Sequence, residues 1–302
     1  MKKRSKLLSL ALSTVLVMSS FVGCSSQKSA ESSKKIGMVV STLNNPFFVS
    51  MKVGAEKKAK ELGYSLVVLD SQNDAAKERS NVEDLVQQGI VALIINPTDS
   101  DAVVNSIKFA NDNNIKVITL DRKSNGGEVA CHIESDNVKG GEMAAKFILE
   151  KLNGKGRLVE LQGIPGASAT RDRGKGFHNI VDKKDGVKVV ASQAADFDRQ
   201  KGLNVTENVI QATPQFDAIF AHNDEMALGA IKAVKAAHKT VVIVGFDGND
   251  DAKAAVKSGD LAATIAQKPS LMGSVAVENA VKIAKGEIVQ KEIPVELQLI
   301  KK

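Results

Sequence analysis

The chain has 302 residues, of which 43% are hydrophobic and 25% are charged, and its formal net charge is +6 at pH 7. This length predicts about two domains of ordinary globular composition. Residues 1–23 contain four basic residues and no acidic one, so the remainder carries a formal charge of only +2. The charge therefore gives no support for nucleic-acid binding, which needs a concentrated basic surface.

The N-terminal segment is typical of an export signal. A basic start, MKKRSK, precedes an apolar run, LLSLALSTVLVM, that is short for a membrane span. The following FVGC resembles a bacterial lipoprotein signal, so we expect residues 1–23 to be removed and Cys24 to be lipidated. Phe21 departs from that pattern, which leaves an ordinary secretory signal or an uncleaved anchor as alternatives. Residues 24–34 are rich in Ser and Lys and are expected to form a flexible tether.

Short apolar runs alternate with helical patterns in the first half of the remaining chain. We predict strands at residues 35–42, 65–70, 92–97 and 116–121, and helices at residues 46–62, 74–88 and 100–112. The strands are continuous Val, Ile and Leu runs, as in parallel sheets that are covered on both faces. This alternation predicts a doubly wound α/β lobe.

The second half repeats this pattern after an extra strand at residues 128–136. A helix is predicted at 137–152 and another at about 270–285, with further helical segments between strands at 157–163, 188–196, 218–224, 240–247 and 261–267. We therefore expect two similar α/β lobes, with the join near Ser135-Asp136.

Polar and aromatic residues follow almost every predicted strand. They include Asn44, Asn45, Phe47, Phe48, Asp121, Arg122, Arg173, Phe197, Asn223, Phe246, Asp247 and Gln267. Ligands of open α/β sheets bind beyond the carboxyl ends of the strands. Asp, Asn, Arg and Gln can each bind two neighbouring hydroxyls, and Phe rings can cover the apolar faces of a sugar. Any one of these residues could instead be a helix cap or a turn, but their recurrence in both halves favours a sugar-like ligand.

The stretch LNNPFF at residues 43–48 is the densest part of this set. Pro46 suits the first position of a helix, which places Asn45 at the cap position. Phe47 and Phe48 would then lie about 100° apart on the first turn. We do not expect both rings to face one core layer, so at least one is expected to stack against a ligand.

Enzyme and metal-site motifs are scarce. There is no GxSxG, P-loop or HExxH motif, and the four histidines have no spaced acidic or cysteine partners for a metal. A carboxylate pair such as Asp121 and Asp247 could serve a glycosidase, but each lies beside an Arg or a Phe and is expected to accept hydrogen bonds instead. With Cys24 lipidated, Cys131 has no disulfide partner and is expected to be a small buried residue.

Several stretches, in order along residues 35–302, resemble one protein family. They include VVSTLNNPFFVS, GYSLVVLDSQND, VITLDR, IESDNVKGG, VELQGIPGASATRDRGKGF, HNDEMALGA and LAATIAQ. The chain resembles the bacterial pentose- and hexose-binding periplasmic proteins. LacI-like repressors share that fold but begin with a helix-turn-helix, whereas this chain begins with an export signal.

The resemblance implies two doubly wound parallel-sheet lobes joined by three crossover segments, the type I periplasmic-binding-protein fold. The crossovers, which would act as hinges, are expected near Ser135-Asp136, Ala266-Gln267 and Val295-Glu296. The N-terminal lobe would then contain residues 35–135 and 268–295, and the C-terminal lobe residues 136–267 and 296–302.

Carried over position by position, the resemblance implies sugar contacts from both lobes. Those of the N-terminal lobe are Asn45, Phe47, Phe48, Asp121 and Arg122. Those of the C-terminal lobe are Arg173, Phe197, Asn223, Phe246 and Asp247, with Gln267 beside a crossover. The Phe rings would enclose the sugar ring and the polar side chains would bind its hydroxyls, without a cofactor or a metal.

The expected function is capture of a monosaccharide, D-ribose first, and its delivery to an ATP-binding-cassette permease. Alternatives are another small sugar (allose, psicose or autoinducer-2) or a sugar sensor without a transport role. We expect a monomer that is not an enzyme, anchored through Cys24 to the outer face of the cell membrane.

Overall fold

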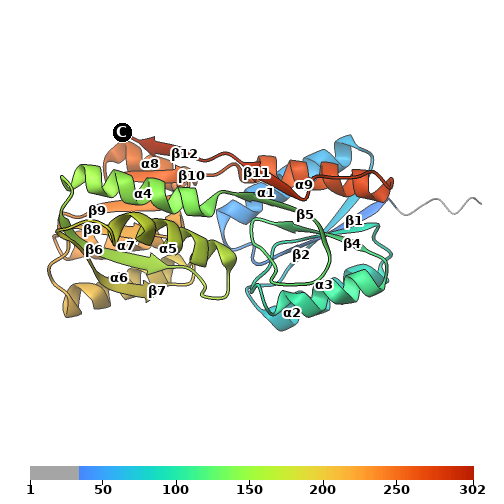
Figure 1. Ribbon diagram of the computed structural model, residues 1–302, viewed down its shortest axis with the longest axis horizontal. Coiled ribbons are helices and arrows are strands. Elements are labelled where there is room, and N and C mark those ends of the chain that lie inside the picture. The colour runs from blue at the N-terminus through green and yellow to red at the C-terminus, as the bar shows by residue number, and fades with distance from the viewer. Residues whose placement is uncertain (1–33) are drawn as a thin grey trace, which may run out of the picture. The chain divides into compact units, whose positions relative to one another are not determined.

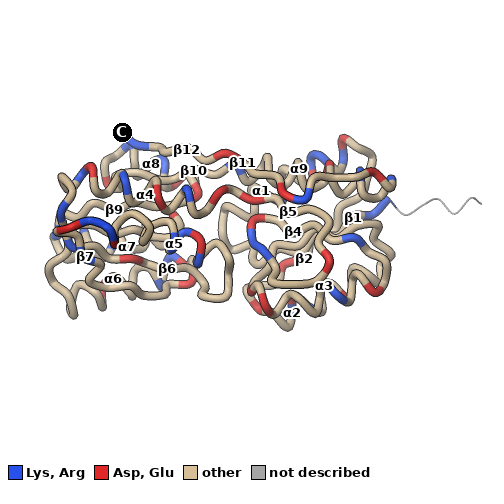
Figure 2. Tube along the Cα trace, in the orientation of Figure 1, with Lys and Arg blue, Asp and Glu red and all other residues tan. Residues whose placement is uncertain are grey.

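The structure is a computed structural model that describes residues 34–302 (Figure 1). The predicted signal at residues 1–23, the predicted lipidation site Cys24 and nearly all of the predicted tether lie outside the described residues. None of the helices in the described range combines the length and the apolar character that crossing a membrane requires. Lys and Arg are interspersed with Asp and Glu along this part of the chain (Figure 2).

Two six-stranded sheets form the centres of two α/β lobes. The first sheet has the order β11-β5-β4-β3-β1-β2 and contains β1 (Lys35–Val40), β2 (Ser65–Asp70), β3 (Ala92–Ile95), β4 (Lys116–Leu120), β5 (Val129–Ser135) and β11 (Glu292–Val295). The second sheet has the order β12-β10-β9-β8-β6-β7 and contains β6 (Gly156–Gln162), β7 (Val187–Ala194), β8 (Ala218–Ala221), β9 (Val242–Asp247), β10 (Ala263–Ala266) and β12 (Gln298–Lys301). This organisation confirms the predicted fold class.

One strand pair departs from the parallel arrangement. β12 pairs with β10 in the antiparallel direction, whereas the other pairs in both sheets are parallel. β12 begins only three residues after β11 ends, so the chain passes directly from the edge of one sheet to the edge of the other. β12 therefore enters the second sheet from the end at which its parallel strands finish.

Helices cover both faces of each sheet. The helices are α1 (Pro46–Glu61), α2 (Ala75–Gln87), α3 (Val103–Asp112), α4 (Asn137–Lys151), α5 (Ser168–Val181), α6 (Arg199–Ala212), α7 (Asp224–Ala236), α8 (Asp250–Ser258) and α9 (Pro269–Ala284). β1 illustrates the result: Ile36 and Met38 pack with residues of α1 and α9, whereas Val39 packs with residues of α2 and α3. Because side chains alternate between the faces of a strand, two covered faces need a continuous apolar run.

The chain passes between the lobes three times. It leaves the first sheet after β5, and α4 packs in the core of the second lobe. It returns after β10, and Met272, Ala276 and Val277 of α9 pack in the core of the first lobe. The third passage joins β11 to β12. The predicted lobe boundaries and hinge residues stay a prediction.

Candidate ligand-binding site

A cavity of about 10 Å³ is lined by residues of both lobes. Its lining residues are Asn45, Phe47, Phe48, Asp121, Arg122, Ala169, Arg173, Phe197, Asn223 and Asp247. All of them except Ala169 belong to the set that the sequence predicted. In this arrangement the lining side chains leave room for about one water molecule.

Phe47 and Phe48 occupy the first turn of α1. Asn45 caps this helix, with its Oδ1 accepting a hydrogen bond from the Phe47 N–H at 2.9 Å, and Pro46 is the first helical residue, which confirms that prediction. The two rings meet edge to face, with centroids 5.2 Å apart and planes at 86°. Both rings line the cavity and both pack in the same core cluster. The expectation that they would not share a core layer was wrong, because edge-to-face contact lets adjacent rings reach one layer.

Phe197 forms the opposing aromatic wall in the second lobe. Its φ is +61°, a left-handed conformation that is costly for a bulky residue. Two neighbours hold it there: Asn223 donates from Nδ2 to the Phe197 carbonyl at 3.2 Å, and Gly163 leaves room for the ring where a Cβ would collide with it. Backbone strain of this kind is found at functional sites, where the surrounding structure maintains it.

Arg122 lies between aromatic rings of the two lobes. Its guanidinium carbon is 5.3 Å from the centroid of Phe48 and 5.2 Å from that of Phe197. Its Nη1 donates to the Pro97 carbonyl at 3.2 Å. Arg122 is therefore held by its own lobe and faces the ring of the other.

Asp121, beside Arg122, is fixed by an asparagine that the sequence did not single out. Asn96 donates from Nδ2 to Asp121 Oδ2 at 3.2 Å and to the Leu120 carbonyl at 3.0 Å. Asp121 Oδ1 and Arg122 Nε are buried and have no hydrogen-bond partner in the described part of the chain. Buried polar atoms without partners are costly, so both atoms mark places where a ligand hydroxyl would be stabilising.

Arg173 projects from α5 and is held by three groups of the second lobe. It donates from Nε to Asn137 Oδ1 at 2.9 Å and from Nη1 to the His222 carbonyl at 2.6 Å. Its guanidinium carbon lies 3.8 Å from the centroid of the Phe246 ring. Phe246 is fully buried and is not among the residues that line the cavity, so it supports Arg173 from behind.

Asp247 ends β9 and pairs with Arg173, with Oδ1 and Nη1 3.7 Å apart. Gln267 donates from Nε2 to the same Oδ1 at 2.9 Å. Gln267 does not line the cavity, so it contributes to the site by holding the Asp247 carboxylate in place.

The buried charges of the site balance one another. Burial raises the pKa of Asp121 and of Asp247, and the nearby Arg122 and Arg173 oppose this rise. Burial also lowers the pKa of both arginines, which stay charged because a guanidinium is not deprotonated in proteins. Two carboxylates facing two guanidiniums leave a formal charge of zero, which suits an uncharged ligand.

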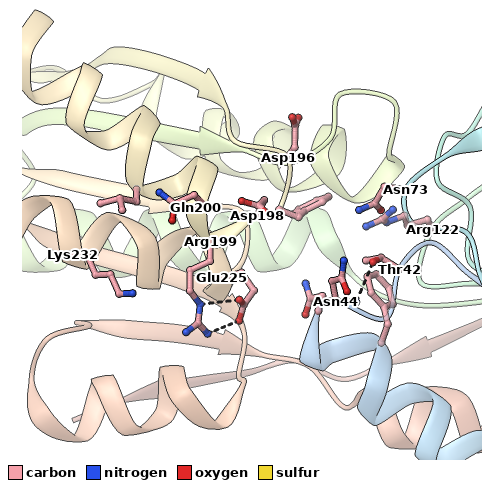
Figure 3. Close-up of a pocket in the computed structure, with 14 residues that line it drawn as sticks. Thr42, Asn44, Asn73, Arg122, Asp196, Asp198, Arg199, Gln200, Glu225 and Lys232 are labelled. Carbon is pink, nitrogen blue, oxygen red and sulfur yellow. Dashed lines mark hydrogen bonds and ion pairs between the residues drawn. The ribbon is translucent and has the colours of Figure 1, made fainter.

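A wider pocket adjoins the cavity and shares four lining residues with it: Asn45, Phe48, Arg122 and Phe197. Figure 3 shows Thr42, Asn44 and Asn73 on the first-lobe side of this pocket. On the second-lobe side, Arg199 donates to both carboxylate oxygens of Glu225 at 2.9 Å (Figure 3). The rim of the second lobe is thus ordered by a bidentate ion pair.

Three residues of the site were missed from the sequence. Asn96 directly follows β3, so the same reasoning from polar residues after strands could have identified it. Asn137 follows the predicted join, and only its contact with Arg173 reveals its role. Ala169 has no polar group and gives no signal in a single sequence. His222 does not line the cavity; its Nε2 bonds Glu160 Oε1 at 2.9 Å.

Residues 36–288 match a family model described as a periplasmic binding protein domain. The chain belongs to the periplasmic binding protein family. This assignment agrees with the two lobes and with a cavity lined by both.

Curated relatives, and solved structures of similar proteins, match nearly the whole chain. The chain is 55% identical to the ribose import binding protein of Haemophilus influenzae, over 95% of this chain and 98% of that protein. It is 51% identical to the ribose import binding protein of Bacillus subtilis, over 96% and 98%. The Caulobacter myo-inositol binding protein, solved with myo-inositol, is 32% identical with a TM-score of 0.86 and covers 90% of this chain and 94% of its own.

Proposed function

We propose that this periplasmic binding protein captures D-ribose outside the cytoplasmic membrane and delivers it to an ATP-binding-cassette permease. The ribose import binding proteins named above support this proposal at more than half identity over nearly full length. A D-allose-binding protein of Escherichia coli is 34% identical, so the similarity favours ribose over allose.

One observation carries the assignment of the site. Asp121 Oδ1 and Arg122 Nε are a buried acceptor and a buried donor at a cavity that is also lined by Phe47, Phe48 and Phe197. A sugar offers hydroxyls for such atoms and C–H faces for the rings. Because the buried groups would be left unpaired by an analogue that lacks a hydroxyl, the same arrangement would provide selectivity.

Ligand capture would proceed by closure of the lobes. The sugar contacts Asp121 and Arg122 in one lobe and Arg173, Asn223 and Asp247 in the other, so it binds the closed form better than an open one. Closure also excludes water, which strengthens each polar contact. The bends are proposed to lie at the crossovers Ser135-Asp136, Ala266-Gln267 and Val295-Glu296.

Titration calorimetry tests the ligand assignment. Purified protein, freed of any bound sugar by unfolding and refolding, is titrated with D-ribose, D-allose, D-psicose, autoinducer-2 and myo-inositol. We expect ribose to bind most tightly. Tighter binding of another compound would replace ribose as the ligand, and no binding of any of them would refute a sugar-binding function. A deletion strain should grow slowly on limiting ribose if the protein imports the sugar, whereas a purely sensory role predicts normal growth.

The lipid anchor is a further part of the proposal. The residues FVGC at 21–24 support cleavage before Cys24 and its acylation. Growth with radiolabelled palmitate should label the wild-type protein in the membrane fraction. Cys24→Ser should remove the label, and release of an unlabelled wild-type protein into the medium or periplasm would contradict the anchor.

A further inference from the structure

The two lobes also contact each other directly through residues that do not line the cavity. The Ser100 N–H donates to the Gly166 carbonyl at 3.0 Å, and Arg171 donates from Nη2 to Ser100 Oγ at 3.1 Å. The Lys123 N–H donates to Ser168 Oγ at 2.8 Å. Ser100 and Lys123 follow strands β3 and β4 of the first lobe, whereas the other three lie between β6 and the second turn of α5. We call these five residues, together with Asp99, the lobe latch.

Each side of the lobe latch is ordered by its own lobe. Asp99 Oδ1 accepts hydrogen bonds from the N–H groups of Asp101 at 2.8 Å and Ala102 at 2.9 Å, which fixes its carboxylate at the start of α3. On the other side, Arg171 donates from Nη1 to the Gly166 carbonyl at 3.0 Å. Groups that are already held in place lose little entropy when the two sides meet, so these contacts stabilise the closed form efficiently.

Gly166 allows the closest approach in the latch. A Cβ at this position would overlap the Asp99 carboxylate of the other lobe. Gly166 does not have a positive φ, so its backbone conformation is open to other residues. The need for glycine therefore arises from the closed arrangement of the lobes and not from the conformation of its own loop.

The lobe latch and the cavity have no residue in common. We propose that the latch sets the affinity of this protein for all its ligands by stabilising the closed form, and contributes nothing to discrimination between them. The proposal rests on ligand binding by lobe closure, as proposed above. When only a fraction of the protein is competent to bind, the apparent dissociation constant rises by the reciprocal of that fraction, whatever the ligand.

Titration of latch variants with two sugars, ribose and the next tightest ligand, tests the proposal. Arg171→Ala removes one interlobe bond and should weaken both ligands by the same factor, about 3- to 10-fold. Gly166→Ala should also weaken both by a common factor, because the added methyl would displace the Asp99 carboxylate from the closed arrangement. Lys183→Ala, an exposed basic residue of the same lobe, is the matched control and should leave both affinities unchanged.

The double variant Gly166→Ala with Asp99→Ser separates a blocked closure from a damaged fold. Serine keeps a capping oxygen at the start of α3 but is shorter, so it should restore most of the affinity lost in Gly166→Ala. Failure of this rescue, unequal factors for the two sugars, or wild-type affinity in Gly166→Ala would each overturn the proposal. If the wild-type protein binds no sugar, the proposed function fails instead.

A distance measurement tests the latch without any ligand. Spin labels at Lys77→Cys and Glu207→Cys, two exposed positions in different lobes, report lobe separation in a chain that also carries Cys24→Ser. Cys131 is fully buried and should not be labelled. We expect the sugar-free protein to contain a larger closed fraction than sugar-free Gly166→Ala. Equal fractions would overturn the proposal.

Discussion

The guanidinium of Arg173 lies over the ring of Phe246, with 3.8 Å between the guanidinium carbon and the ring centroid. Phe246 is itself fully buried. A desolvated cation–π contact of this kind contributes about 2 kcal/mol, so the ring fixes the position from which Arg173 reaches the cavity.

Replacing Phe246 should therefore weaken ligand binding although the ring does not line the cavity. For Phe246→Leu we expect a loss of about 1–2 kcal/mol of ribose-binding free energy, measured by calorimetry. Phe147→Leu is the matched control, because Phe147 is buried in the same core cluster and lies on α4. Equal losses of affinity in the two variants would show that Phe246 acts only through general packing.

Asn223 has two roles that substitutions can separate. Its Oδ1 caps α7 by accepting from the Met226 N–H at 3.0 Å, and its Nδ2 donates to the Phe197 carbonyl at 3.2 Å. Asn223→Asp keeps the cap and should retain stability, but it should lose about 2–4 kcal/mol of binding. Asn223→Ala should lose similar binding and also about 1 kcal/mol of unfolding free energy. Denaturant unfolding and calorimetry measure the two effects, and an Asp variant with wild-type affinity would remove Asn223 from the site.

The balance of charges in the cavity predicts rejection of anionic sugars. Asp121 and Asp247 face Arg122 and Arg173, so no buried positive charge is left for a phosphate. An unpaired buried charge is costly, and ribose 5-phosphate should bind at least about 100-fold more weakly than ribose. Competition calorimetry measures the ratio. Comparable affinity for the two compounds would mean that the arginines are not neutralised by the carboxylates.

Glu78, on α2, should make the stability of the protein depend on pH. Its carboxyl is fully buried, and its Oε1 has no hydrogen-bond partner in the described residues. The Thr98 N–H donates to Oε2 at 2.7 Å, which favours the charged form. Burial outweighs this hydrogen bond and raises the pKa of Glu78 to about 7. The folded protein then holds a proton between about pH 4.5 and 7 that the unfolded chain has released. The contribution of Glu78 to stability should therefore fall as pH rises through this window.

Glu78→Gln tests this directly. We expect the variant to exceed the wild type in unfolding free energy at pH 8, by on the order of 1–3 kcal/mol, and to differ little near pH 5. Urea unfolding at both pH values measures the difference. Glu83→Gln, on the same helix with its carboxylate paired to Arg79 near the surface, is the matched control for loss of a carboxylate. A constant difference for Glu78→Gln would contradict an elevated pKa.

Most of the architecture could be predicted, because each long apolar run of the sequence fits a buried strand better than any other element. Continuous runs such as residues 35–40 need two covered faces, and the helical segments between them supply the covers. β11 and β12 were not predicted as strands, because a strand of four residues gives too short a pattern to recognise. They are recognisable only once the edge strands that they pair with are known.

Site residues that directly follow strands could be predicted from the sequence. Residues that hold another side chain in place were harder to predict. Phe246 was expected on the cavity because it follows a run of strand residues and because the resemblance implies a sugar contact there. Adjacent strand residues point to opposite faces, so only one of Phe246 and Asp247 can reach the cavity. Asn137 and Gln267 hold Arg173 and Asp247 by contacts between distant segments, which local sequence does not reveal.

The most direct test of the central claim is a crystal structure of the protein with D-ribose. We expect one sugar ring in the cavity between Phe48 and Phe197, with hydroxyls within hydrogen-bonding distance of Asp121 Oδ1 and Arg122 Nε. A sugar bound elsewhere, or one in the cavity that leaves both of these atoms unpaired, would contradict the account.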